Sequence, residues 1–196
     1  MPTQAPTRER ASVWEVHIIT TPISDTAIAD LLVKDELREL AMRYCRAIDR
    51  RDPALLATVY HEDAHDEHGT AFNGPISEFI TALETVMAAF EVTQHSISNT
   101  SFRIDGDMAE GELYFDAYHR TVPPEPKHVL VRGRYLDRYE RRAGEWRIAH
   151  RWLVWDSYET TEVNPQDADT LRALGEGGAA ASDYSYRRLS LFGRGR

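Results

Sequence analysis

The first residue whose position suggests chemistry is the carboxylate Asp49. It follows a series of apolar residues spaced mostly three and four apart: Ile28, Leu31, Leu32, Leu37, Leu40, Ala41, Tyr44, Cys45 and Ile48. That spacing is typical of a helix with one buried face, so the helix would carry Tyr44 and Asp49 to its inner end. A carboxylate in that position is either a solvated helix terminus, beside Arg50 and Arg51, or a base set into a pocket.

Two histidines on expected strands are candidate acids or bases. His95 has polar neighbours, so it is either an ordinary strand residue or a base: Thr93, Gln94, Ser96 and Ser98. His119 shares a face with Leu113, Phe115 and Ala117. Either its ring is hydrogen-bonded to one neighbour and does no chemistry, or it is a second acid or base in a cavity wall. A neutral imidazole can remove a proton next to a carbonyl or leaving group, and a carboxylate on its other nitrogen stabilises the imidazolium. Only the fold could join His95 to Asp49, 46 positions earlier.

Two further side chains could act on a substrate. Arg151 is expected to share a strand face with Arg147, Ala149, Leu153 and Trp155. It would either form an ion pair at the rim or stabilise negative charge that develops on an enolate or a leaving group. Tyr44 lies on the apolar face of its helix, so it is either a core residue whose hydroxyl finds one partner or a hydrogen-bond donor to a substrate oxygen.

A short acidic and histidine-rich run could in principle hold a metal ion: His61, Asp63, His65, Asp66 and His68. The first three would lie on one face of a strand, and alternating ligands of that type can bind a divalent ion. Such runs are commonly solvated, however, and this one lies where a helix gives way to a strand. We therefore expect no metal. The sequence also has no Gly-rich phosphate loop, no G-x-S-x-G motif and no cysteine pair, which argues against nucleotide, acyl-serine and zinc-finger chemistry.

Three helices and four long strands are expected to position these residues. Apolar periodicity and the Asp52–Pro53 start signal predict helices over residues 26–49, 53–60 and 75–90. The apolar period then changes to two, which predicts strands at 91–105, 108–121, 128–142 and 145–159. This order is an α+β pattern, in which a strongly curved sheet can wrap around the helices and leave a pocket between them.

The length of 196 residues and a hydrophobic content of 42% suit one domain with additional ends. We place an N-terminal extension at 1–25, whose VWEVHII segment could form an extra strand or an arm on a neighbour, and the domain at 26–160. The tail at 161–196 is rich in Gly, Ala and Ser, which predicts that it is mobile or packed on a partner subunit.

The bulk composition limits the classes of binding partner and the cellular compartment that we expect. A net charge of −9 without a basic block argues against nucleic acid. No apolar run approaches the roughly 18 residues of a membrane span. The sequence has no secretory signal and a single cysteine, Cys45. We therefore expect a cytoplasmic protein with no membrane partner.

Several blocks in consecutive order resemble the SnoaL-like family of the nuclear transport factor 2 (NTF2-like) superfamily. They are YCRAIDRRD, LLATVYHEDAHDEHG, NGPISEFI, TQHSISNTSF and GRYLDRYERRAGEWRIAHR, within residues 28–158. Within the family, the chain resembles γ-hexachlorocyclohexane dehydrochlorinase, scytalone dehydratase and the bile-acid dehydratases. This resemblance implies a cone-shaped barrel in which three N-terminal helices pack in a strongly curved, mostly antiparallel sheet.

The resemblance also implies roles for individual residues. The eliminating members use a histidine–aspartate pair, which matches His95 and Asp49. Tyr44 matches a tyrosine of the bile-acid dehydratases, Arg151 matches an arginine of the dehydrochlorinase, and His119 corresponds roughly to a second histidine of scytalone dehydratase. The sequence departs from the dehydrochlorinase at Tyr44 and His119, so the substrate need not be a chlorinated ring.

Together, the residues and the resemblance predict a cofactor-independent lyase of the dehydratase type, or an isomerase. His95 and Asp49 would abstract a proton from a small apolar cyclic, polyketide-like or steroid-like substrate. Two alternatives use the same fold without chemistry: a module that binds a hydrophobic ligand, and a structural subunit like the small subunit of ring-hydroxylating dioxygenases. The resemblance further implies a homo-oligomer, either a dimer or a trimer.

Overall fold

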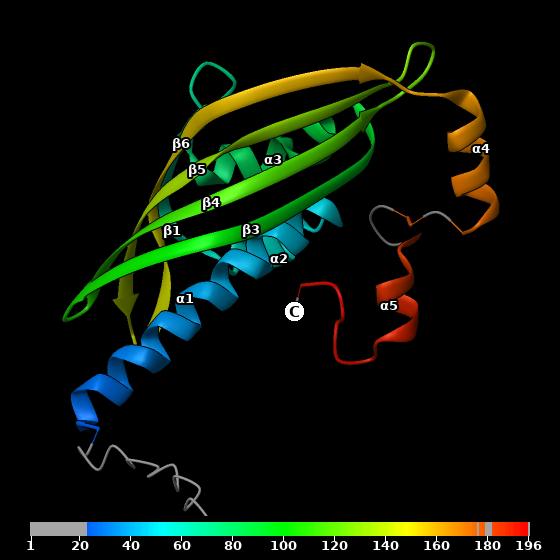
Figure 1. Ribbon diagram of the computed structural model, residues 1–196. Coiled ribbons are helices and arrows are strands. Elements are labelled where there is room, and N and C mark those ends of the chain that lie inside the picture. The colour runs from blue at the N-terminus through cyan, green and yellow to red at the C-terminus, as the bar shows by residue number, and fades with distance from the viewer. Residues whose placement is uncertain (1–22, 176, 179–181, 196) are drawn as a thin grey trace, which may run out of the picture.

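The computed structural model describes residues 23–175, 177–178 and 182–195 (Figure 1). In chain order, the elements up to the third helix are α1 (Asp25–Asp49), α2 (Pro53–Ala57), β1 (Tyr60–Glu67), β2 (Asn73–Pro75) and α3 (Ile76–Met87). The remaining elements are β3 (Phe90–Asp105), β4 (Met108–Thr121), β5 (Lys127–Arg142), β6 (Glu145–Glu162), α4 (Pro165–Ala173) and α5 (Tyr184–Arg188). The VWEVHII segment lies outside the described residues.

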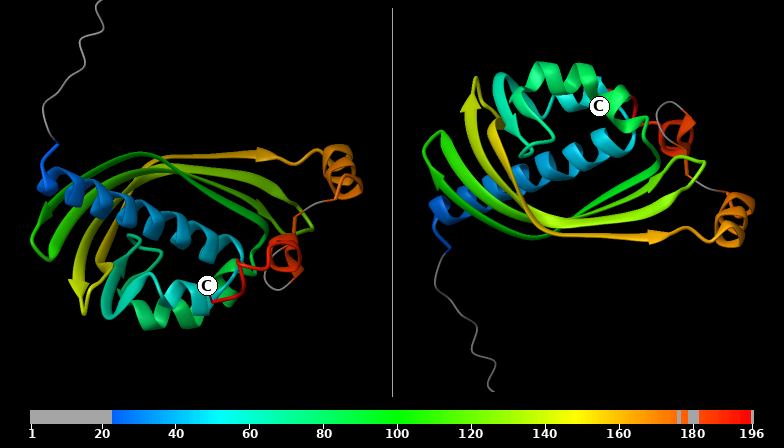
Figure 2. Two further views of the ribbon diagram at one scale, coloured as in Figure 1. Left: turned by 90° about the horizontal axis from the view of Figure 1, so that it is seen from below. Right: turned by 90° about the horizontal axis from the view of Figure 1, so that it is seen from above.

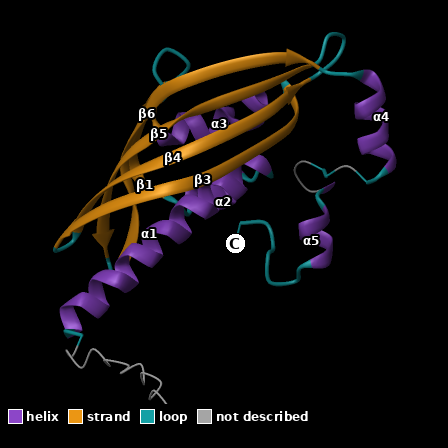
Figure 3. Cartoon of the chain, in the orientation of Figure 1, coloured by secondary structure: helices purple, strands orange, loops and turns teal. Residues whose placement is uncertain are grey.

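The six strands form one curved sheet in the order β2-β1-β6-β5-β4-β3. Every neighbouring pair is antiparallel except β1 and β6, which run parallel. Helices α1, α2 and α3 lie on the concave side of the sheet, as the two views of Figure 2 show. The α+β prediction and the mostly antiparallel sheet are confirmed. The sheet is more open than a barrel, because β2 and β3 remain its two edges (Figure 3).

Helix α1 has two halves with different surroundings. The side chain of Ser24 caps its start by accepting a hydrogen bond from the backbone N–H of Ala27 at 3.2 Å. The half nearest Asp49 is buried, but the first half extends past the sheet (Figure 1). Three residues of the predicted buried face are exposed there: Ile28 (45%), Leu31 (61%) and Leu32 (59%). The prediction of one continuous buried face was therefore wrong in this half, because the helix is longer than the core it crosses.

A tight turn after α1 fixes the position of Asp49. Arg51 adopts a positive φ of 47° and donates a hydrogen bond to the backbone oxygen of Phe90 at 2.6 Å, which ties the end of α1 to the start of β3. Asp52 then caps α2 by accepting from the backbone N–H of Leu55 at 3.0 Å. Helix α2 ends at Ala57, earlier than predicted, and the next residues enter β1.

The described part of the tail packs against this same turn. Tyr186 donates its hydroxyl to Asp52 Oδ2 at 2.9 Å, and Arg50 Nε lies 3.3 Å from Asp183 Oδ1. Burial would raise the pKa of Asp52, but hydrogen bonds from Gly195, Leu55 and Tyr186 outweigh it and lower that pKa. The tail thus contacts its own chain, a third arrangement beside the mobility and the partner contact that we expected.

An irregularity in β6 changes which face its residues occupy. The pairing of β5 with β6 shifts by one residue between Arg138 and Tyr139. Because successive strand residues point to opposite faces, the extra residue turns Arg151 to the buried face that also holds Ile148. The prediction that Arg151 shares a face with Arg147 was therefore wrong. Among the described residues, no helix is both long and apolar enough to cross a membrane.

Candidate active site

A cavity of about 340 Å³ lies between the helices and the concave face of the sheet. This volume is within the usual range for small-molecule sites. Its walls are largely apolar and include Ile48, Phe72, Phe79, Met87, Phe115, Val131 and Leu153. Its polar lining consists of Tyr44, His68, His95, His119, Thr121, Tyr135, Trp155 and Tyr158. Val86, Trp155 and Tyr158 are exposed as well as lining the cavity, so they mark the side that opens to solvent.

The structure brings Asp49 and His95 together at the wall of this cavity. The Nδ1 atom of His95 lies 2.7 Å from Asp49 Oδ1, and the backbone N–H of His95 donates to Asp49 Oδ2 at 3.0 Å. With both carboxylate oxygens engaged, a neutral His95 carries its proton on Nδ1 and leaves Nε2 as the accepting nitrogen. The side chains of Arg50 and Arg51 bind elsewhere, so Asp49 is not part of a solvated charged helix end.

His119 stands beside His95 on the neighbouring strand β4. The two rings are perpendicular, with centroids 5.3 Å apart, and the ring of Phe90 lies 4.6 Å from His119 on another side. Burial, reinforced by the proximity of His95, lowers the pKa of His119 to about 4. The ring is therefore neutral near pH 7. Its buried Nδ1 has no hydrogen-bond partner among the described residues.

Tyr44 lies at the inner wall of the cavity, with only 2% of its surface exposed. Its ring packs against the guanidinium of Arg151 at 4.1 Å and meets the edge of Tyr135 at 5.5 Å. Burial raises the pKa of the Tyr44 hydroxyl, and the nearby positive charge of Arg151 opposes that rise. The burial of Tyr44 and the packing of its ring favour the core role over the role of substrate donor.

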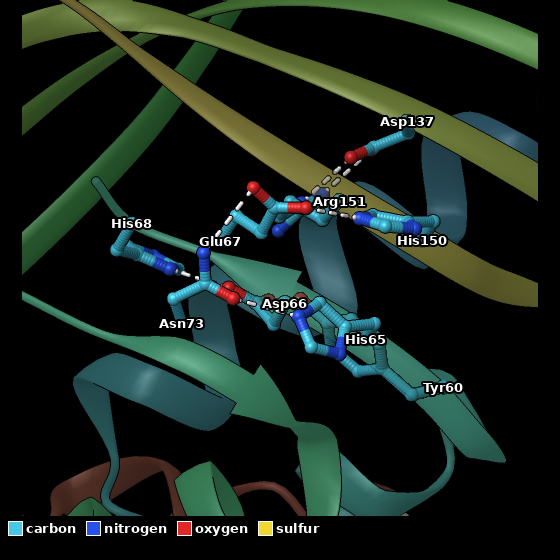
Figure 4. A network of polar contacts seen from close by, with 9 residues as sticks. All are labelled: Tyr60, His65, Asp66, Glu67, His68, Asn73, Asp137, His150 and Arg151. Carbon is cyan, nitrogen blue, oxygen red and sulfur yellow. Dashed lines mark hydrogen bonds and ion pairs between the residues drawn. The ribbon is translucent and has the colours of Figure 1, made fainter. Parts of the chain in front are cut away.

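Arg151 does not line the cavity. It is completely buried, and its Nε and one terminal nitrogen each donate to a carboxylate oxygen of Asp137 at 2.7 Å (Figure 4). Its guanidinium also lies 4.0 Å from the centre of the Tyr135 ring. The expectation that Arg151 touches substrate, or forms an ion pair at the rim, is therefore corrected. The irregularity in β6 places this residue beneath the cavity wall, where it supports Tyr44 and Tyr135.

The histidine-rich run divides into an outer and an inner group. On the outside, Asp63 pairs with Arg142 at 2.7 Å and His65 contacts Asn73 at 2.8 Å. His61 is buried and contacts the backbone oxygen of Glu140 at 2.9 Å. Within the described ranges, no three or more His, Cys, Asp or Glu side chains are grouped as metal ligands.

Asp66 and His68 form the inner group, which the sequence reasoning missed. Asp66 is fully buried, accepts a hydrogen bond from the Tyr60 hydroxyl at 2.7 Å, and forms an ion pair with Nδ1 of His68 (Figure 4). His68 lines the cavity. The available signal was alternation, because Ala64, Asp66 and His68 occur at every second position and the small apolar residue marks the inward face.

Comparison with known proteins places the chain in a family. The SnoaL-like domain profile matches residues 29–152. The chain belongs to the SnoaL-like family. An uncharacterised protein of Mycobacterium tuberculosis is 28% identical over 129 residues, which are 64% of this chain and 86% of that protein.

Solved structures share the fold at low sequence identity. A provisionally assigned scytalone dehydratase from Novosphingobium aromaticivorans is 21% identical, with a TM-score of 0.63 over 70% of this chain and 93% of that one. A type 2 hexachlorocyclohexane dehydrochlorinase is 17% identical, with a TM-score of 0.64 over 70% and 97% of the two chains. An NTF2-like superfamily protein from Salmonella enterica is 18% identical, with a TM-score of 0.60 over 65% and 94%. The NTF2-like fold predicted from the sequence is thus confirmed.

Proposed function

We propose that this SnoaL-like protein is a lyase of the dehydratase type, or an isomerase, that begins its reaction by removing a proton from carbon. The observation that carries the proposal is the contact between His95 and Asp49 at the wall of an apolar cavity. A dehydratase and a dehydrochlorinase among the structural neighbours support the same class of reaction. The reaction needs only side chains that this chain supplies, so the proposal includes no cofactor.

In this mechanism, Nε2 of His95 takes a proton from a carbon next to a carbonyl group. Asp49 holds the ring by its Nδ1–H and stabilises the imidazolium that forms, and a base of this kind contributes roughly 10²–10⁴-fold. The electron pair either expels a leaving group, which completes an elimination, or accepts a proton at another carbon, which completes an isomerisation. Neutral His119 stands beside His95 and can hydrogen-bond the oxygen on which negative charge develops.

The cavity walls indicate the class of substrate. Aromatic and aliphatic side chains dominate them, with polar groups at a few positions, which suits a small cyclic molecule with one or two oxygen substituents. A polyketide-like or steroid-like ring system meets that description. We also retain the homo-oligomer and the cytoplasmic location as parts of this proposal.

Hydrogen–deuterium exchange tests proton abstraction without knowledge of the product. Cyclic ketones of one to four fused rings would be incubated with the protein in D₂O, and deuterium at the carbon next to the carbonyl would be followed by NMR. We expect the protein to catalyse exchange of at least one ketone. H95Q should lose that exchange, whereas H128Q should retain it, because His128 contacts Tyr118 and does not line the cavity.

Two outcomes would contradict the proposal. Exchange that persists in H95Q at the original rate would exclude His95 as the base. Ketones that bind in the cavity but exchange no faster than in buffer would instead favour the non-catalytic binding module.

A further inference from the structure

A second histidine–carboxylate pair, His68 with Asp66, reaches the same cavity. Asp66 is completely buried and both of its oxygens have partners, the Tyr60 hydroxyl on one and Nδ1 of His68 on the other. This is the arrangement of the His95–Asp49 pair, in which both carboxylate oxygens are also engaged. In each pair the carboxylate holds Nδ1, so Nε2 is the nitrogen available to a ligand.

The two pairs come from opposite edges of the sheet. His68 directly follows β1, which lies next to the edge strand β2, whereas His95 lies on β3, the other edge strand. The curvature of the sheet brings both histidines to one cavity. A small ligand inside it can therefore meet an imidazole from each side.

The surroundings of His68 fix its ring and keep its partner ionised. The ring stacks on Phe79 of α3, with centroids 5.3 Å apart and planes 18° from parallel. Burial would raise the pKa of Asp66, but its hydrogen bonds from His68 and Tyr60 and the charges of His68 and Arg151 outweigh burial and lower that pKa. A rigid imidazole beside a buried carboxylate is suited to carry a proton and to hold it at a fixed point.

The other polar residues around the cavity are less suited to donate a proton. His119 is neutral near pH 7, because its pKa is about 4, and no carboxylate contacts it among the described residues. Burial raises the pKa of the Tyr44 hydroxyl, which makes it a poor acid. Among the residues that line the cavity, His68 is thus the other histidine besides His95 with a carboxylate partner.

We propose that His68, oriented by Asp66, donates the proton that the departing oxygen takes during elimination. The inference rests on the proposed function and deepens it, because it requires a substrate with a hydroxyl group on the carbon β to a carbonyl. His68 is the second catalytic residue of that reaction, and Asp66 is a positioning residue that acts through it.

The step balances as follows for a cyclic β-hydroxyketone. The α C–H bond breaks and its proton goes to Nε2 of His95, while its electron pair forms the C=C bond. The C–O bond breaks, and the oxygen leaves with the electron pair of that C–O bond and takes a proton from Nε2 of the His68 imidazolium, which releases water. His95 is then cationic and His68 neutral, and proton exchange with solvent resets both.

The test separates proton abstraction from departure of the hydroxyl group. H68Q would be assayed on a cyclic β-hydroxyketone for water loss, by the absorbance of the conjugated enone, and on the matching ketone without the hydroxyl for exchange in D₂O. We expect water loss to fall about 10²-fold, with exchange retained within about threefold. D66N should weaken water loss in the same selective way. H65Q is the matched control, because His65 lies on the same run but contacts Asn73 outside the cavity.

Outcomes that overturn this inference differ from those that overturn the proposed function. If H68Q leaves water loss unchanged, or lowers exchange as much as water loss, then His68 is not the donor. If the unmodified protein exchanges no ketone, the proposed function fails instead.

A second measurement avoids variants that fail to fold. Imidazole-¹⁵N NMR of the unmodified protein, with the cyclic β-hydroxyketone added, should shift the Nε2 resonance of His68. A resonance that does not move would overturn the inference.

Discussion

Two aspartates in this protein each hold a nitrogen-bearing side chain, but in different surroundings. Asp49 and His95 meet at 2.7 Å at the wall of the cavity. Asp137 and Arg151 meet at 2.7 Å in the interior, where Arg151 has no exposed surface and Asp137 has 3%. One pair can touch a ligand and the other cannot.

This difference indicates that the Asp49–His95 pair serves function and that the Asp137–Arg151 pair serves stability. A base that must exchange protons with a substrate needs access to a cavity, which His95 has. A guanidinium sealed in the interior must instead keep its carboxylate, because losing one partner leaves an uncompensated buried charge. Burial and charge alone therefore do not identify a functional residue. Contact with the cavity does, and this criterion selects His95 and His68 over Arg151.

The largest expected effect separates two carboxylates at the same helix end. D49N removes the charge that orients His95, so the rate of ketone exchange should fall about 10²–10⁴-fold while the melting temperature changes little. D52N, three residues away, should do the reverse, because Asp52 caps α2 and binds Tyr186. Exchange kinetics and thermal unfolding measure the two properties. Equal loss of activity in both variants would contradict the division.

The next effect concerns the sealed pair. D137N leaves the buried charge of Arg151 without its carboxylate, so the free energy of unfolding should fall by about 3–5 kcal/mol. Urea denaturation measures that change. The double variant D137L/R151M, which removes both charges, should recover part of the loss. A D137N protein as stable as the original would show that the pair does not hold the interior together.

Acid should destabilise the protein through His119. The unfolded chain takes up this proton near pH 6.5, but the folded chain does so only near pH 4, because burial lowers the pKa to about 4. The unfolded state therefore binds more protons between these values, and stability falls as the pH falls through them. By pH 4.5 the loss from this residue should be about 2 kcal/mol. H119F should remove that part of the loss, as urea denaturation at pH 7 and pH 4.5 would measure.

The sequence predicted the helices and long strands well because their apolar periods are unambiguous. It could not predict the pairing of Asp49 with His95 from spacing, and only the family resemblance suggested it. Arg151 was misplaced for a different reason. One extra residue in β6, between Ile148 and His150, reverses the face that strict alternation would give Arg151, and no side-chain pattern in the sequence marks that position.

His68 was missed because it belongs to a run of charged and histidine residues that is typical of a solvated surface. Seven acidic or histidine residues within eight positions resemble a solvated run, and Asp63 and His65 are indeed on the outside. Alternation alone cannot tell which of the two faces of a short strand will be buried. The fold decides this: Asp66 lies opposite Arg151 in the pairing of β1 with β6, and both residues are fully buried.

The smallest expected effect concerns Tyr44, which lies between the two regions. Its ring both lines the cavity and packs on Arg151 at 4.1 Å. Y44F keeps the ring and its packing and removes only the hydroxyl, so the free energy of unfolding should fall by no more than about 1 kcal/mol. The rate of ketone exchange should fall less than about tenfold, because His95 and Asp49 are untouched. A much larger loss of activity, at unchanged stability, would show that this hydroxyl binds the substrate oxygen. Tyr44 would then belong with His95 and Asp49 as a functional residue and not with the buried Asp137–Arg151 pair.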